Sequence, residues 1–370
     1  MDLARWTRDM LRPLVGHHPR LKSWLIERGR SVEALKHAAS DLVPALIRPR
    51  TRNLTIAVTA RCNLRCMGCR YGRDFMTAQQ LPLGIVHDLL DDAAKAGVET
   101  IRLYGGEPLL HDDLPAMVQR AVALGLSPYV TTNATLLERR IDDLHAAGLR
   151  TITVGFYGTD EAYDAYTGNA RGFDQMERGV AAVRERHGDS VRLRLNWLLM
   201  RPTANRESLD AALAFARRYR APIQIDLIHY SLPYFTEGPD RCLQFRPEDE
   251  PAVRALAERL LEVQRAEPWL LEHSAIGLRS IPDWLLRGPA MRVPCDKYDM
   301  LWIGADGSVQ LCYVTFPLGN LHRQRLSTIL GSEAHVAAAR AAFRLACPNC
   351  HCGYDNRTQK HLPSRRRYAR

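Results

Sequence analysis

Several features that mark membrane, secreted and repetitive proteins are missing from this chain. No stretch approaches the roughly 18–20 uninterrupted apolar residues of a membrane span. Residues 1–12 carry charges every few positions, so they lack the apolar core of a signal peptide. No low-complexity block is present, and no internal repeat beyond a strand–helix unit. We therefore expect a cytoplasmic protein.

The composition is that of an ordinary globular protein. Of 370 residues, 46% are hydrophobic and 25% charged, which suits one large domain and a smaller one. The net charge of +10 can favour an anionic partner, such as a phosphorylated substrate or acidic lipid headgroups. We expect a small-molecule substrate that carries an anionic group. Peripheral membrane contact through the basic N-terminus is a second option, whereas nucleic-acid binding is not expected.

Strand-like and helix-like segments alternate from residue 53 onward. The alternation implies a parallel sheet with helices outside, either open or curled into a barrel. Loops after the carboxyl ends of such strands converge on one face. The predicted strands are Asn53–Thr59, Glu99–Tyr104, Pro128–Thr132, Thr151–Phe156, Val191–Met200 and Ile223–His229, with helices such as Leu83–Ala96, Leu114–Leu124 and Glu207–Tyr219.

Other segments flank this α/β unit. Residues 1–50 read as a basic helical extension, either an amphipathic membrane-surface element or one that packs on the main domain. We favour packing, because Pro13, Gly16 and Pro19 break any single long helix. The α/β unit spans residues 51–235, and a loop with a helical connector spans 236–290. Residues 291–355 combine a β-hairpin (Tyr298–Ile303 and Ser308–Val314) with one helix (Ser327–Leu345), and 356–370 read as a solvated, disordered basic tail.

The nine cysteines fall in clusters, which in a cytoplasmic chain favours metal binding over disulfides. Cys62, Cys66 and Cys69 follow the first predicted strand with C-x3-C-x2-C spacing. A 4Fe-4S cluster takes four thiolates, so three on one loop leave an iron open to another ligand. Zinc is the competing metal, but neither His87 nor His111 has the knuckle spacing of a fourth ligand.

A second motif, Gly105-Gly106-Glu107-Pro108, follows the second strand, and its glycines permit close backbone approach to a ligand. Together with the cysteine loop it resembles the radical S-adenosylmethionine (radical SAM) superfamily, over roughly residues 53–352. The resemblance implies a partial (β/α)6 barrel. It also implies that S-adenosylmethionine binds the open iron and is reductively cleaved to a 5′-deoxyadenosyl radical, which abstracts a substrate hydrogen.

The resemblance also implies cofactor-binding residues. Gly105, Gly106 and Glu107 would bind the methionine amino group, and Asn133 lies in a segment similar to the family's T-N-G. Position 68 is glycine where many members carry an aromatic near the adenine, and Tyr71 is the candidate substitute. Asn196 would point towards the cofactor or, equally, bond to backbone. Gly155 replaces a serine that often contacts the cofactor ribose, which leaves that contact open.

The C-terminal cysteines form a second constellation. Four thiolates from Cys295, Cys312, Cys347 and Cys350 suit either an iron–sulfur cluster or zinc on chemistry alone. Their arrangement resembles the SPASM/twitch extension of radical SAM enzymes, in which C-x(9–15)-G-x4-C precedes C-x2-C. The resemblance implies one auxiliary 4Fe-4S cluster, with Cys352 as a spare or alternative ligand.

Cys242, after the sixth strand, belongs to neither group. It could donate a hydrogen atom to a substrate radical, as in some radical SAM epimerases, or be a loop cysteine without function. The function that we expect is oxidation or epimerisation of a small polar metabolite: a sugar, aminocyclitol, nucleoside, or phosphorylated or lipid-linked molecule. A peptide- or protein-modifying maturase is the alternative, and an iron–sulfur electron carrier a remote one. A reducing partner such as flavodoxin or ferredoxin is expected.

Overall fold

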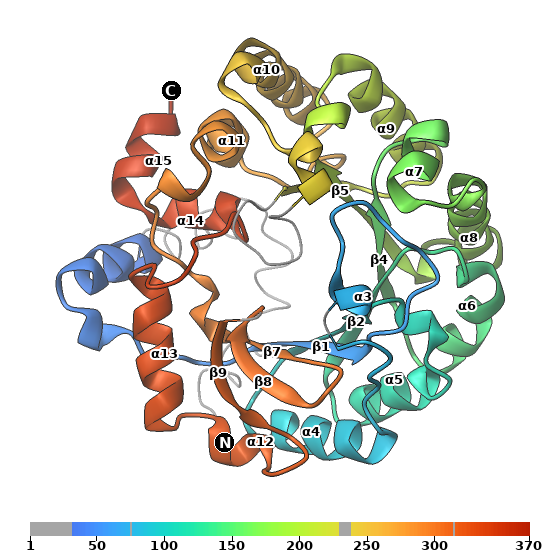
Figure 1. Cartoon of the computed structure of the whole chain (residues 1–370), viewed down its shortest axis with the longest axis vertical. Helices are drawn as coiled ribbons and strands as arrows, with labels where there is room; N and C mark the ends of the chain where they lie inside the picture. The colour runs from blue at the N-terminus through green and yellow to red at the C-terminus, as the bar shows by residue number, and fades with distance from the viewer. Residues whose placement is uncertain (1–31, 75, 229–237, 314) are drawn as a thin grey trace, which may run out of the picture.

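Six parallel strands form a curved sheet, a partial barrel, at the centre of the molecule (Figure 1). The computed structural model describes residues 32–74, 76–228, 238–313 and 315–370. Neighbouring strands pair in chain order, so their carboxyl ends share one edge. The six predicted strands are confirmed, with ends shifted by no more than two residues. They are β1 (Asn53–Thr59), β2 (Thr100–Gly105), β3 (Ser127–Thr132), β4 (Thr151–Phe156), β5 (Arg192–Leu199) and β6 (Ile223–Leu227).

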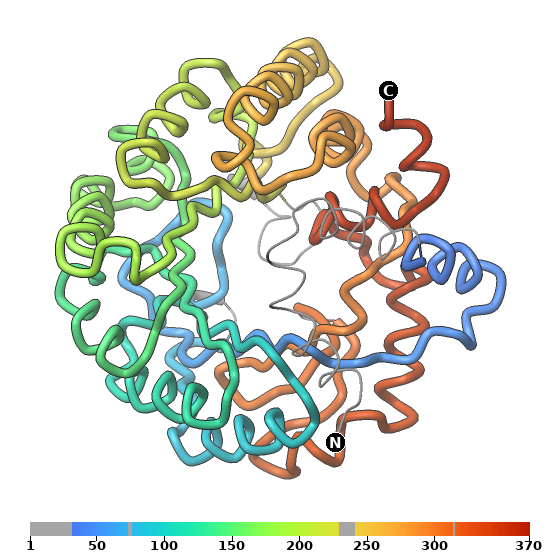
Figure 2. Tube along the Cα trace, turned by 180° about the vertical axis from the view of Figure 1, so that it is seen from behind, coloured from blue at the N-terminus to red at the C-terminus, as the bar shows by residue number. Residues whose placement is uncertain are grey.

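Helices surround the sheet on its outer side (Figure 2). Alternate strand residues face opposite sides, so Leu54 and Ile56 of β1 pack into the main core while Thr55 between them lines the inside of the barrel. Arg102 of β2 and Asp226 of β6 line the same inner side. These outer helices are α4 (Leu83–Lys95), α5 (Leu114–Ala123), α6 (Leu137–Ala146), α7 (Asp160–Thr167), α8 (Gly172–His187), α9 (Arg206–Arg218), α10 (Glu250–Ala266) and α11 (Ala275–Arg287). The short helix α3 (Tyr71–Asp74) lies on the inner side, where Tyr71 packs with Ala57 and Trp302.

The predicted hairpin is confirmed, and it joins the barrel sheet. Its strands are β7 (Met300–Ile303) and β8 (Ser308–Cys312), followed by β9 (Thr315–Asn320), which the sequence did not reveal. β7 pairs in parallel with β1, so within the described residues the sheet has nine strands. Leu301 and Ile303 of β7 enter the main core, whereas Trp302 faces the inside of the barrel. Cys312, at the end of β8, is thereby fixed to the barrel wall.

The single helix predicted over 327–345 is wrong, because the chain forms two. α12 (Leu326–Ile329) ends before Gly331, whose φ of +74° is left-handed, and α13 (Glu333–Phe343) starts after it. The Ser332 hydroxyl accepts a hydrogen bond from the His335 backbone N–H and caps α13.

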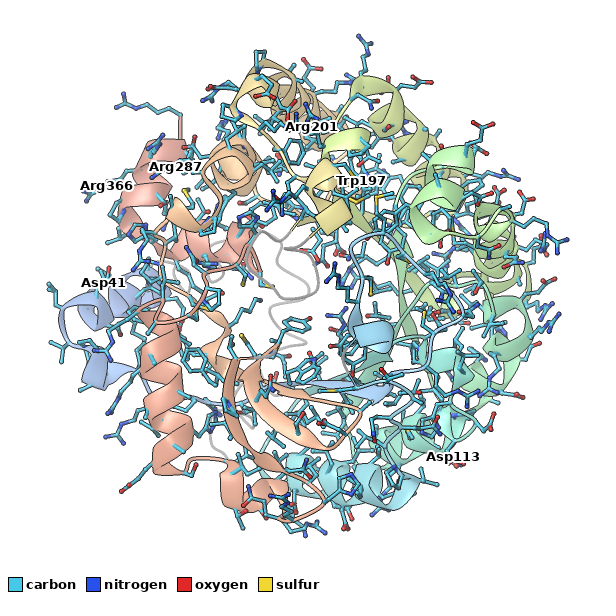
Figure 3. The ribbon with its side chains drawn as sticks, in the orientation of Figure 1. Asp41, Asp113, Trp197, Arg201, Arg287 and Arg366 are labelled. Atoms are coloured by element: carbon cyan, nitrogen blue, oxygen red, sulfur yellow. The ribbon has the colours of Figure 1, made fainter. Side chains whose placement is uncertain are left out.

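The prediction of a disordered tail is also wrong. Residues 354–368 form α14 (Tyr354–Lys360) and α15 (Leu362–Tyr368). Ser364 and Tyr368, four residues apart on one face of α15, are buried, and the Tyr368 hydroxyl donates to Asp283 of α11. Arg366 points outward (Figure 3). The sequence did not reveal this packed face, because the segment is rich in basic residues and reads as solvated.

The described part of the N-terminal extension packs on α13. Residues 32–42 are helical. Ile47 packs with Ala339 and Phe343, and Arg340 donates to the backbone carbonyl of Ala45. Residues 1–31, where most of the predicted extension falls, lie outside the described residues. Among those described, no helix is both long and apolar enough to cross a bilayer.

Candidate active site

A cavity of about 230 Å³ opens at the carboxyl ends of the strands, and all three cysteines of the first loop line it. We call it the cysteine cavity. A set of three thiols fits an iron–sulfur cluster with one iron left for a further ligand. Of the nine predicted cluster-loop and cofactor-binding residues, eight line this cavity: Cys62, Cys66, Cys69, Tyr71, Gly105, Gly106, Asn133 and Asn196.

The cysteine loop is held from two sides. Asn63 donates from Nδ2 to Thr135 Oγ1 over 2.8 Å, and its Oδ1 accepts from Asn133 Nδ2 at 3.0 Å. On the other side, the Met67 backbone N–H donates to the carbonyl of Tyr166, at the end of α7, over 2.7 Å. The loop after β3 and helix α7 therefore fix the loop that carries the thiols.

The structure gives a reason for glycine at positions 105 and 106 that is more specific than the close approach of a ligand. A Cβ on Gly105, whose φ is +151°, would lie 2.1 Å from the Thr59 carbonyl oxygen. A Cβ on Gly106 would lie 2.3 Å from the Arg61 carbonyl oxygen. The backbone after β2 thus packs directly on the residues that lead from β1 into the cysteine loop. A side chain at either position would push that loop away.

Gly106→Ala should therefore destabilise the protein by at least ~2 kcal/mol and lower its iron content, since the rigid backbone cannot yield. Urea unfolding and iron analysis measure both effects. Gly84→Ala is the control: nothing lies within 4 Å of the added Cβ at this position in α4, so stability should stay equal or rise by ~0.5–1 kcal/mol. Equal stability of the two variants would contradict the close-packing argument.

Glu107 is fully buried and connects the loops after β2 and β3. Its carboxylate accepts hydrogen bonds from Thr132 Oγ1 (2.7 Å), the Asn133 N–H (2.8 Å) and the Leu109 N–H (3.0 Å). Unlike its neighbours, Glu107 is not among the described residues that line the cavity. Its role in binding the methionine amino group stays a prediction. The geometry shows a positioning role for its side chain.

Burial raises the pKa of Glu107 to about 7, although the three donated hydrogen bonds oppose the rise. Between about pH 4.5 and 7 the folded chain then binds more protons at this site than the unfolded chain. The free energy of unfolding should fall as pH rises through this window, by up to ~1.4 kcal/mol per pH unit. Glu107→Gln should lack this contribution. Parallel stability profiles of the two proteins from pH 4.5 to 8, measured by urea unfolding, would show that Glu107 does not titrate this way.

Tyr157 is a cavity residue that the sequence reasoning missed. A Cβ at Gly155 would lie 2.7 Å from the Tyr157 hydroxyl oxygen, so this hydroxyl occupies the space of the side chain that glycine lacks. The signal was present, because an aromatic residue two positions after a strand glycine can fold back over it. Asn196 is paired with Gly155 in the register of β4 and β5, on the same wall.

The four C-terminal thiols lie together. Cys295, Cys347 and Cys350 are close enough to Cys312 to help raise the pKa of its thiol, after the larger effect of burial. Burial likewise raises the pKa of Cys295 to about 12, so cationic iron would be needed to hold these groups as thiolates. Among the described residues no three His, Cys, Asp or Glu side chains converge on one metal ion. The thiolates of a 4Fe-4S cluster bind separate irons and lie further apart than the ligands of one ion.

Arg357 supports this group, and it too was missed, because it falls in the predicted tail. The residue is 1% exposed, and its guanidinium donates to the carbonyl oxygens of Val293, Pro294 and Cys350. It also lies over the Trp284 ring, 4.7 Å from the centroid. One buried side chain therefore ties the segment before Cys295 to the loop that bears Cys350.

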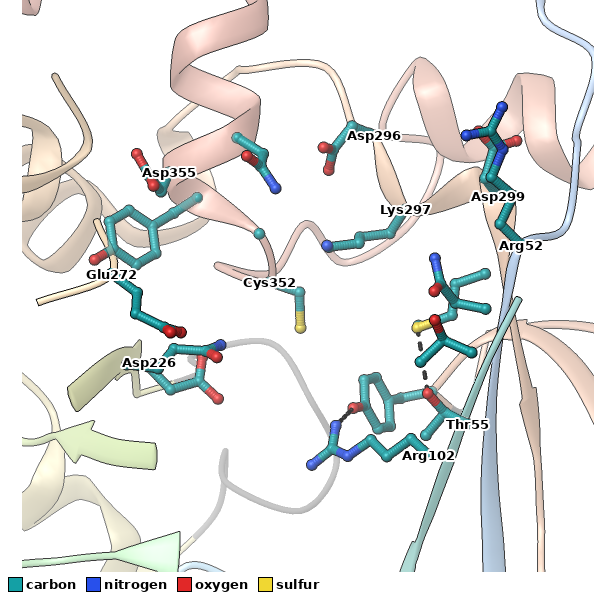
Figure 4. Close-up of a pocket in the computed structure, with 18 of the residues that line it drawn as sticks. Arg52, Thr55, Arg102, Asp226, Glu272, Asp296, Lys297, Asp299, Cys352 and Asp355 are labelled. Atoms are coloured by element: carbon teal, nitrogen blue, oxygen red, sulfur yellow. Dashed lines mark hydrogen bonds between the residues drawn. The ribbon is translucent and has the colours of Figure 1, made fainter. Parts of the chain in front are cut away.

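Two cysteines remain. Cys352 points into a second, larger cavity, and its predicted role as a spare or alternative cluster ligand stays a prediction (Figure 4). Cys242 is exposed, with its Sγ 3.5 Å from the Sδ of Met67 in the cysteine loop, and it is not among the described residues lining either cavity. Its predicted role as a hydrogen-atom donor stays a prediction.

The second cavity fills the barrel interior towards the amino ends of the strands and measures about 600 Å³. We call it the lumen cavity. Arg102, Asp226 and Tyr313 line both cavities, so the two adjoin. Arg102 donates to Tyr313 Oη (2.9 Å) and Thr131 Oγ1 (3.0 Å). Because Tyr313 follows Cys312, this contact links the barrel wall to the C-terminal thiols.

Comparison with known proteins gives two family matches. Residues 56–216 match the radical SAM superfamily, and residues 295–352 match SPASM, an iron–sulfur cluster-binding domain. Together they show that the chain belongs to the radical SAM superfamily and is an enzyme with a SPASM domain. Its cofactors are S-adenosylmethionine, a 4Fe-4S cluster and a second, auxiliary cluster in the SPASM domain, which confirms the cofactors expected from the sequence.

The curated relatives match only part of this chain. The GTP 3′,8-cyclase of Xanthomonas campestris pv. campestris (strain B100) is 35% identical over 161 residues, covering 40% of this chain and 46% of that protein. The GTP 3′,8-cyclase of Chlorobaculum tepidum is 37% identical over 155 residues, covering 41% and 46%. The chain thus spans about half the length of these curated relatives.

Solved structures share the fold. That of anSMEcpe with bound AdoMet has a TM-score of 0.63 at 16% identity, covering 86% of this chain and 92% of that one. Streptococcus suis SuiB bound to precursor peptide SuiA has a TM-score of 0.61 at 16% identity, covering 83% and 70%. At 16% identity this structural similarity confirms the partial-barrel fold, but it gives no information about the substrate.

Proposed function

We propose that this radical SAM enzyme abstracts a hydrogen atom from a small polar molecule held in the lumen cavity. The observation that carries the proposal is the wall shared by the two cavities, formed by Arg102, Asp226 and Tyr313. A molecule in the lumen cavity would lie next to S-adenosylmethionine in the cysteine cavity. The volume of about 600 Å³ is within the usual ~300–1,000 Å³ of small-molecule sites.

When bound, the cluster and S-adenosylmethionine supply the radical that removes the hydrogen. The chain's own residues would position the reactants. Cys62, Cys66 and Cys69 would hold the cluster, and Gly105 and Gly106 would place backbone beside the cofactor. Tyr313 extends from the SPASM hairpin to the wall between the cavities, so a substrate there would be close to the auxiliary cluster. This arrangement suits oxidation or epimerisation, in which an electron or a hydrogen atom must be exchanged with the substrate radical.

The test is anaerobic incubation of the reconstituted enzyme with deuterated candidate substrates and a chemical reductant. Deuterium in 5′-deoxyadenosine from a sugar, aminocyclitol or nucleoside supports the proposal. Deuterium transfer from a peptide alone supports the maturase alternative instead. The GTP 3′,8-cyclase relatives make GTP a candidate nucleotide, although they match only part of this chain.

A further inference from the structure

The described part of the N-terminal extension carries an exposed apolar stripe. Among the described residues seven large hydrophobic side chains are exposed, and five of them lie between residues 32 and 46: Val32, Leu35, Leu42, Val43 and Leu46. Leu42 is 86% exposed and Leu35 is 64% exposed. Apolar side chains gathered on a surface in this way mark a contact with another protein or with a membrane.

Helical geometry turns this stripe away from the barrel. Residues 32–42 are helical, and at about 100° per residue Leu35 and Leu42 lie on the same side of the helix. His37 points to the opposite side, where it is buried, and its ring lies edge-on to Phe343 of α13 with centroids 4.8 Å apart. Because α13 holds the buried side, the apolar stripe faces outward. Figure 1 shows this helix on the outside of the molecule, beside α13.

Positive charge is concentrated in the same part of the sequence. Residues 1–52 contain eleven Lys or Arg and five Asp or Glu, so they carry six of the ten net positive charges of the chain. Lys36 and Arg48, which are close in sequence to members of the stripe, are exposed. A basic segment with apolar side chains along one side is typical of elements that lie in the surface of a membrane with anionic lipids.

A second basic element lies beside this one. α15 exposes Arg366 and Arg367, of which Arg367 also pairs with Asp283. Burial lowers the pKa of His361, at the start of α15, and Asp41 of the N-terminal helix is close enough to oppose that shift. Figures 1 and 2 show the N-terminal helix and α15 on the same side of the molecule, and Figure 3 labels Asp41 and Arg366 there. One partner can therefore meet the apolar stripe and both groups of basic side chains.

We propose that this side of the protein docks on the surface of a membrane that contains anionic lipids. The stripe would enter the boundary between headgroups and acyl chains, and the basic side chains would pair with lipid phosphates. The inference is independent of the proposed function. A second copy of the chain fits less well, because it would bring like charge to the same surface. Residues 1–31 hold seven Lys or Arg and three Asp or Glu, so they too bring mainly like charge.

The test is co-sedimentation of the reconstituted full-length enzyme with vesicles of phosphatidylcholine alone or of phosphatidylcholine mixed with phosphatidylglycerol. The enzyme should bind the mixed vesicles at least about tenfold more tightly, and added salt should weaken this binding. Equal affinity for the two kinds of vesicle, or binding to neither, would overturn the inference.

Three variants locate the surface. Leu42→Glu should weaken binding to the mixed vesicles at least about tenfold, through the loss of one inserted leucine. Val122→Glu is the matched control, because Val122 is also an exposed aliphatic residue but lies on α5, across the molecule from the stripe (Figure 1). Arg366→Gln should weaken binding about fivefold, the effect of one basic side chain near an anionic surface.

All three variants should form 5′-deoxyadenosine as the unmodified enzyme does, which shows that they are folded. Arg366→Gln keeps the inference testable if Leu42→Glu does not fold. Unchanged binding in both Leu42→Glu and Arg366→Gln, or an equal loss in Val122→Glu, would contradict this surface. A dimer that Leu42→Glu dissociates, in an enzyme that binds no vesicles, would assign the stripe to a second copy instead and overturn the inference.

Discussion

Cys62→Ala is expected to abolish formation of 5′-deoxyadenosine from S-adenosylmethionine. The loop supplies three thiols to one cavity, and among the residues that the structure describes no other cysteine lines it. A cluster held by only two of them would lose its third protein ligand, together with the geometry that leaves a single iron open. Chromatography of anaerobic reactions with dithionite as reductant measures the product.

Cys312→Ala is the matched control. It removes one thiol from the C-terminal group, so it should leave part of the S-adenosylmethionine cleavage while impairing conversion of the substrate. Full cleavage in Cys62→Ala would show that the first loop does not hold the catalytic cluster. Unchanged substrate conversion in Cys312→Ala would refute a role for the second group.

Arg357→Met is expected to destabilise the SPASM domain and to cost it its cluster. The variant leaves the carbonyl oxygens of Val293, Pro294 and Cys350 without their shared buried donor. Each unsatisfied acceptor costs about 1–3 kcal/mol, so the free energy of unfolding should fall by at least ~3 kcal/mol. Iron should drop from about eight to about four per chain, because the segments that bear Cys295 and Cys350 lose their connection.

Urea unfolding and iron analysis measure both quantities. Arg366→Met is the control, since this arginine is exposed on α15 and its loss should change stability by less than ~0.5 kcal/mol. Iron near eight per chain in Arg357→Met would contradict the positioning role of Arg357. Cleavage of S-adenosylmethionine should persist in this variant, because the hydrogen bonds that hold the cysteine loop join it to Asn133, Thr135 and Tyr166 of the barrel.

Much of the barrel was predictable because its signal is local. A buried parallel strand shows an apolar side every second residue, as in Leu54, Ile56 and Val58 of β1, and this survives in a single sequence. The pairing of β7 with β1 was not predictable. It joins residues about 250 positions apart, and nothing in either strand encodes its partner.

The candidate site was likewise predictable only in part. Cysteine spacing and the double glycine identified the residues around the cysteine cavity, since those motifs are contiguous in the chain. Arg357 was hidden because a buried arginine and a solvated one look alike in a basic segment. Arg102, Asp226 and Tyr313 come from three separate segments, and only the folded chain brings them to the wall between the two cavities.

Transfer of deuterium into 5′-deoxyadenosine tests the central claim most directly. The reconstituted enzyme is incubated with S-adenosylmethionine, reductant and carbon-deuterated small polar molecules, and the nucleoside is analysed by mass spectrometry. We predict deuterium from a small polar molecule, and none in Cys62→Ala. Deuterium from a peptide substrate alone, with none from any small polar molecule, would contradict a small-molecule site in the lumen.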